Sequence, residues 1–142
     1  MKKIALVAGV VMLLASMVFA AGISKKDLAS LKGTWEGRAY TTQADGSMKL
    51  EILNDTEPLQ GKATITNIDK LRVSDAPTWT GDRYEGQADN GVITNKGTVM
   101  FIGQGGNVFE ITSLAKDKSG KLTLGGWIYG KGAKVDFSLK KK

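Results

Sequence analysis

The stretch that decides the fold lies near the C-terminus and reads Ala133-Lys134-Val135-Asp136-Phe137-Ser138-Leu139-Lys140. Val135, Phe137 and Leu139 alternate with polar residues, so one face of an extended chain is apolar and the other is polar. This period of two predicts a half-buried antiparallel strand. The same alternation recurs over residues 48–52, and two runs, 99–102 and 108–111, are apolar on both faces.

Turn sequences separate the strand-like runs at short, even intervals. Asp-Gly and Asn-Gly pairs supply the positive φ that tight hairpins require. The expected turns lie at residues 44–47, 59–62, 89–91, 95–97, 103–107, 117–120 and 130–132. The runs between them predict eight or nine strands, near 34–42, 47–54, 62–68, 84–88, 91–94, 98–103, 107–114, 121–129 and 133–140.

The fold class that follows is all-β: an antiparallel up-and-down barrel of about eight strands with a short N-terminal helical turn. Consecutive hairpins without crossover helices form a closed barrel or a sandwich. The barrel is favoured because sandwiches usually need long Greek-key connections. Residues 24–32 predict the helical turn, with Ser24 as N-cap and Gly33 as its end. Residues 69–81, with Pro77, predict a long loop.

The first twenty residues predict export. Lys2 and Lys3 precede an apolar run over residues 4–19, and small or compact residues at 18–20 form a cleavage site, which is the pattern of a secretory signal peptide. We therefore expect two parts, a signal peptide at 1–20 and a single β-barrel domain at 21–142 in the periplasm or outside the cell. No stable membrane insertion is expected after cleavage, because the strands carry charges at many alternate positions.

Composition argues against most enzyme chemistry and against metal sites. The chain contains no cysteine and no histidine, so it lacks a thiol nucleophile, the commonest general base and the commonest transition-metal ligands. We expect it not to be an enzyme and to need no cofactor or metal. The net charge of +6, or +4 without Lys2 and Lys3, is concentrated at the two chain ends. No basic stripe with interleaved aromatic residues predicts nucleic-acid binding.

One local motif resembles a known group of proteins. The sequence Leu31-Lys32-Gly33-Thr34-Trp35-Glu36-Gly37, a Gly-x-Trp after a short helical turn, resembles the first strand of the calycins, which include lipocalins, fatty-acid-binding proteins and avidins. The resemblance implies that Trp35 closes one end of the barrel and that Gly33 lets the chain turn into the strand. In lipocalins an arginine of a late strand also packs over this tryptophan, and the sequence shows no convincing counterpart.

Aromatic side chains with polar tips suit a pocket that holds an apolar or amphipathic molecule. The candidates for ligand binding are Trp79, Tyr84, Trp127, Tyr129 and Tyr40. Trp79 is the strongest because it lies in the expected loop at a barrel mouth, although it could equally fold back onto the core.

Two functions of different kinds follow. In the first, an exported lipocalin-like barrel binds a small hydrophobic molecule in its interior. In the second, the barrel has no ligand cavity and binds a protein partner. Calycin-like protease inhibitors are of this second kind and insert a flexible N-terminal segment into the target, here residues 21–26, although they usually carry a disulfide that this chain lacks.

Overall fold

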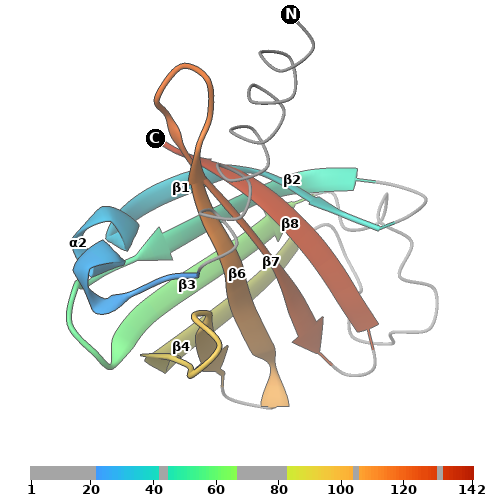
Figure 1. Ribbon diagram of the computed structural model, residues 1–142. Helices are drawn as coiled ribbons and strands as arrows, with labels where there is room; N and C mark the ends of the chain where they lie inside the picture. The colour runs from blue at the N-terminus through green and yellow to red at the C-terminus, as the bar shows by residue number, and fades with distance from the viewer. Residues whose placement is uncertain (1–21, 42–44, 67–82, 104–105, 131–132) are drawn as a thin grey trace, which may run out of the picture.

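The computed structural model describes residues 22–41, 45–66, 83–103, 106–130 and 133–142. Within these ranges a short helical segment precedes eight strands (Figure 1). The elements are η1 (Lys25–Asp27), α2 (Leu28–Leu31), β1 (Gly33–Tyr40), β2 (Asp45–Ile52), β3 (Leu59–Thr66), β4 (Arg83–Ile93), β5 (Val99–Ile102), β6 (Val108–Lys116), β7 (Leu122–Gly130) and β8 (Ala133–Lys141). The expected signal peptide and the expected loop 69–81, with Trp79, lie outside the described residues.

The strands form one closed antiparallel barrel in chain order. Each strand pairs with the next, and β1 pairs with β8 through partners such as Ala39 and Phe137 (Figure 1). The predicted up-and-down barrel is therefore confirmed and the sandwich is excluded, because the hydrogen-bonded ladder closes on itself.

The helical segment covers one end of the barrel, which we call the closed end. The Ser24 N–H and hydroxyl both donate to Asp27 Oδ2, at 2.8 and 2.9 Å, and fix the first turn. Leu28 and Leu31 are buried, and Gly33, with φ +135°, redirects the chain into β1. Ile23 is also buried, and its N–H donates to the Gly97 carbonyl at 2.7 Å. Gly22 and Ile23 are thus packed against the barrel, whereas Lys25 and Lys26 are exposed.

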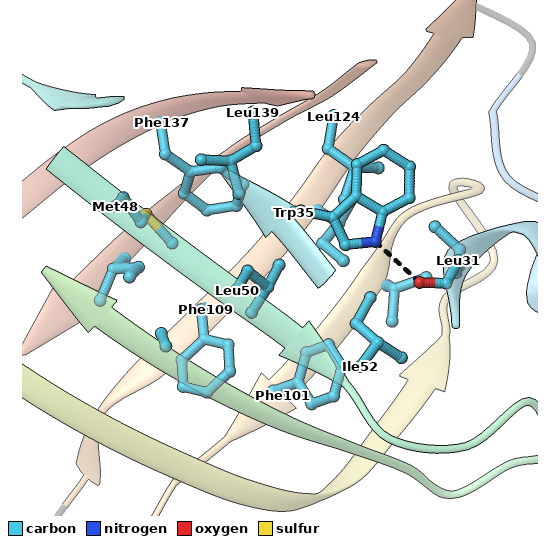
Figure 2. Close-up of a cluster of buried hydrophobic side chains, with 14 of the residues drawn as sticks. Leu31, Trp35, Met48, Leu50, Ile52, Phe101, Phe109, Leu124, Phe137 and Leu139 are labelled. Carbon is cyan, nitrogen blue, oxygen red and sulfur yellow. Dashed lines mark hydrogen bonds between the residues drawn. The ribbon is translucent and has the colours of Figure 1, made fainter. Parts of the chain in front are cut away.

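Trp35 anchors the core beneath this helical segment. Its side chain is 0% exposed, and its indole N–H donates to the Leu31 carbonyl at 2.8 Å (Figure 2). The Lys141 ammonium lies 5.6 Å from the centre of the Trp35 ring and donates to the Ser30 carbonyl at 2.6 Å. A cation of the last strand therefore covers the tryptophan, a contact that the sequence analysis did not foresee.

Aromatic rings seated on glycines fill the barrel below this layer. The Phe101 and Phe109 rings stack with centroids 5.1 Å apart. A Cβ built on Gly91 would overlap the Phe101 ring, and one built on Gly126 would overlap the Phe137 ring. These inward glycines make room for the protein's own side chains, which occupy the interior together with Leu50 and its buried neighbours (Figure 2).

The turn expected at 44–47 lies largely within β2, which begins at Asp45, and two further expected turns are wrong. The turn expected at 59–62 lies at residues 53–58, where the Asn54 side chain donates to the Thr56 and Pro58 carbonyls and accepts the Gln60 N–H at 2.7 Å. Leu59 already begins β3 and is buried. A side chain that binds three backbone groups thus ends β2.

The other misplaced turn is at 89–91, which lies inside β4. The register between β3 and β4 shifts there by one residue, since Gly61 pairs with Ala88 and Leu59 with Gly91. The chain continues through this shift without a turn, so the two expected strands at 84–88 and 91–94 are one strand. No helix within the described ranges is long and apolar enough to cross a membrane.

Candidate binding surface on the barrel wall

The predicted ligand-binding residues are divided between the two faces of the barrel wall. On β7, Leu124 and Ile128 are buried, so Trp127 and Tyr129 point outward. Trp127 and Tyr40 are register partners of the same residue, Asp136, on opposite sides of β8. The structure therefore brings Trp127, Tyr129 and Tyr40 onto one outer face spanning β7, β8 and β1.

Tyr84 is the one described candidate that faces the interior. It pairs with the buried Ile65 and packs against the core. Burial of its hydroxyl raises the pKa of Tyr84 above the ordinary value of 10.0. The four described candidates thus do not share a pocket, and Trp79 lies outside the described residues.

Apolar side chains extend across the outer face from β4 to β7. Met100 pairs with Val92, and Ile102 pairs with Val108, which in turn pairs with Tyr129. Trp127 precedes Tyr129 by two residues on the same face of β7. We call this surface the outer patch, and it consists of Val92, Met100, Ile102, Val108, Trp127 and Tyr129. Ile102 is 55% exposed, and Val92 and Tyr129 are also exposed.

Single exposed apolar residues are ordinary, but contiguous ones across four strands usually mark a contact surface. The register makes the outer patch contiguous, because residues directly opposite on neighbouring strands lie about 5 Å apart.

A single carboxylate is held in the middle of the outer patch. Glu110 Oε1 accepts the indole N–H of Trp127 at 3.0 Å, and Oε2 accepts the Thr98 hydroxyl at 3.0 Å. The Thr98 hydroxyl is also hydrogen-bonded to the Thr94 hydroxyl, with the two oxygens 2.6 Å apart. The Lys134 ammonium lies 5.4 Å from the centre of the Trp127 ring. These contacts fix the orientation of the Trp127 side chain.

A cleft of about 500 Å³ adjoins the outer patch at Ile102. It opens where the β4–β5 ladder ends, since only Val92 and Ile93 of β4 pair with β5. Next to this ladder, the Asn90 side chain accepts the Ile102 N–H at 2.9 Å in place of a backbone carbonyl. The cleft is lined by Glu85, Gly86, Gln87, Ala88, Asp89, Asn90, Ile102 and Asn107.

Sequence reasoning missed Met100, Ile102 and Val108 as surface residues, although their signal was visible. The runs 99–102 and 108–111 are apolar on both faces, and one of those faces must lie outside in a closed barrel. Among the described residues, no three acidic side chains are grouped as metal ligands would be. Comparison of the chain with protein-family models, with curated proteins and with solved structures finds no match.

Proposed function

We propose that the protein is an exported, calycin-like barrel that binds another protein through the outer patch. The observation that carries this proposal is the contiguous apolar and aromatic wall on a barrel whose interior is occupied by its own side chains. Hot-spot residues of protein interfaces are enriched in tryptophan and tyrosine, and Trp127 and Tyr129 supply both.

The calycin-like part of the proposal rests on the closed end. The resemblance is supported by Trp35, which is buried, and by Gly33, whose φ of +135° lets the chain turn into β1. Lys141 of the last strand covers the Trp35 ring, where lipocalins place an arginine. Export rests on the sequence of residues 1–20 alone.

Charge complementarity defines the partner. Carboxylates of Glu85, Asp89 and Asp136 border the outer patch, and the Lys134 ammonium lies beside Trp127. A partner that fits presents a large apolar side chain against Ile102 and Tyr129, with basic residues flanking that anchor. The charged residues at the border of the outer patch would set the association rate, while the apolar contact would supply most of the binding free energy.

The test compares Ile102 with Leu53, a side chain of almost equal exposure, at 55% and 54%, that lies on the turn after β2 and away from the outer patch. A photoactivatable residue is placed at either position in cells, and the crosslinked protein is identified and purified. We expect a specific crosslink from position 102 only. Ile102→Lys should weaken binding of the purified partner by at least about tenfold, whereas Leu53→Lys should not. Equal crosslinking from both positions, or none from 102, contradicts the proposal.

A second candidate is binding of an apolar or amphipathic molecule inside the barrel, and the inward-facing Tyr84 favours it. Tyr84→Phe keeps the ring and removes the hydroxyl that would orient such a molecule. If an apolar fluorescent probe binds the folded protein and Tyr84→Phe weakens this binding, the interior site gains support. If no probe binds, the interior site is rejected and binding through the outer patch remains as the proposed function.

A further inference from the structure

The helical segment and the last residues of β8, both of which carry lysines, meet at the closed end of the barrel. Because the strands alternate in direction, β1 begins at this end and β8 ends there. The turn between β6 and β7 lies at the same end. Lys142 N–H donates to the Thr34 carbonyl at 2.9 Å, and Lys140 pairs with Glu36 in the β1–β8 register. The β6–β7 turn lies beside the C-terminus (Figure 1), where Lys140 contacts Asp117 at 3.4 Å.

This convergence produces an arc of ammonium groups, which we call the basic rim. It consists of Lys32, Lys116, Lys118, Lys121, Lys140 and Lys142, all of them exposed. The carboxylates within the arc are Asp117 and Glu36, so six positive charges face two negative ones and the rim carries a net charge of +4. Over the residues that the structure describes the net charge is also +4, so the rim is more basic than the rest of the described surface taken together.

Both carboxylates of the rim are engaged locally. Asp117 Oδ1 accepts the Ser119 hydroxyl at 2.6 Å and the N–H groups of Ser119 and Lys121 at 2.9 and 3.0 Å. Glu36 lies 3.3 Å from Lys142. Asp117 is therefore mainly a structural part of its turn, and it offsets only part of the positive potential around Lys118 and Lys121.

We infer that the basic rim binds the surface of an anionic phospholipid bilayer. All six cations are lysines, which act as point charges on flexible stems and suit diffuse attraction to a charged surface better than bidentate recognition of one phosphate. The rim contains no aromatic residue on which a nucleic-acid base could stack. Its residues come from the end of α2, from the β6–β7 turn and from the ends of β6 and β8, all at the same end of the barrel.

Because the rim has no apolar anchor, the attachment is electrostatic and peripheral. It should require anionic lipid and weaken steeply as salt shortens the screening length. The outer patch lies on the barrel wall from β4 to β7. It therefore stays accessible when the protein is bound to the bilayer through its closed end.

The test is co-sedimentation of the protein, as isolated from its host, with vesicles of phosphatidylglycerol and phosphatidylcholine or of phosphatidylcholine alone. The variant Lys118→Gln/Lys121→Gln is compared with Lys49→Gln/Lys62→Gln, which removes the same charge from the wall of β2 and β3. We expect binding to the anionic vesicles only, weakened on the order of 20-fold by the rim variant and by no more than a few-fold by the control variant. Raising salt should release the protein.

Each other result overturns the inference. No binding to anionic vesicles, or equal losses for the two variants, removes the rim from the interaction. Binding to neutral vesicles, or binding that persists at high salt, indicates insertion of an apolar segment. Binding to a soluble polyanion such as inorganic polyphosphate without binding to vesicles assigns the rim to a different partner. Circular dichroism checks that both variants keep the native fold.

Discussion

Trp35 combines packing and hydrogen bonding at one position. Trp35→Ala should destabilise the protein by about 3–5 kcal/mol. The substitution removes a fully buried ring, breaks its bond to the Leu31 carbonyl and leaves a cavity in the core. Trp35→Phe should cost less, since it keeps most of the ring and loses the bond to the Leu31 carbonyl. Chemical denaturation measures both, with the half-buried Trp127→Ala as control. A cost below about 1 kcal/mol for Trp35→Ala would contradict the buried position.

Asp117 gives a second prediction at this scale. The Ser119 hydroxyl, followed by the Lys121 N–H, lowers the pKa of Asp117 from 3.8 to about 2. Since the pKa is lower in the fold, the stabilisation from Asp117 is complete above pH about 4 and is lost as the pH falls toward 2. Carboxyl NMR titration should show this low value. Ser119→Ala should move it back toward 3.8, and an unchanged titration would remove the hydroxyl as the main cause.

How far individual residues could be predicted depends on whether their strand is apolar on one face or on both. The Gly33-x-Trp35 motif predicted a buried Trp35, and the structure buries it. Strand parity shows which residues share a face but not which face lies inside. In β7 both sets are apolar, Leu124 with Ile128 and Trp127 with Tyr129, so the orientation followed only from the register with β6 and β8.

Among the elements, β4 depends on a close contact between a glycine and a ring. Gly91→Ala should destabilise the barrel by about 1–3 kcal/mol, because the new Cβ would overlap the Phe101 ring. Gly61→Ala meets the same ring from β3 at 3.1 Å and should cost less. In a double-mutant cycle, Phe101→Leu should relieve Gly91→Ala, so that the combined cost falls below the sum by at least about 0.5 kcal/mol. Additive costs would show that the strain lies elsewhere.

The boundaries of β3 and β4 could not be predicted because local turn chemistry competed with long-range packing. Gly61 and Gly91 resemble turn glycines in sequence, yet both are buried and face Phe101, a residue of β5. The Asn95-Lys96-Gly97 and 117–120 turns were predicted correctly, because their geometry is decided within the turn itself. A glycine therefore indicates a turn reliably only where no side chain from a distant strand packs against its Cα.

At the scale of the molecule, hairpin spacing was enough to predict the closed barrel, because short antiparallel connections leave few other topologies. The two proposed binding surfaces were not predictable in the same way. The outer patch joins residues from β4 to β7, and the basic rim joins the end of α2 to the β6–β7 turn and the end of β8, so each exists only once the register and the closure are fixed. Trp127, Tyr129 and Tyr40 were expected to line an interior pocket, but the register places them on the outer face of the barrel.

Closure of the barrel leads to the last prediction. Deleting residues 139–142 removes the buried Leu139, the Lys141 contact with Trp35 and the Lys142 bond to Thr34, all at the β1–β8 seam. Opening this seam exposes two strand edges and the core between them. We expect a loss of about 5 kcal/mol or more, comparable with the whole stability of a small domain.

Hydrogen exchange distinguishes closure from a local effect. If the barrel unfolds as one unit, amides of β4 and β5 should lose protection together with those of β1, although they lie on strands far from the deletion. The control is Lys140→Gln, which changes an exposed side chain of the same strand and should leave protection intact. Protection lost only in β1 and β8 would mean that the other strands are stable without closure, and the ring of strands would then be a geometric feature rather than the cooperative unit of folding.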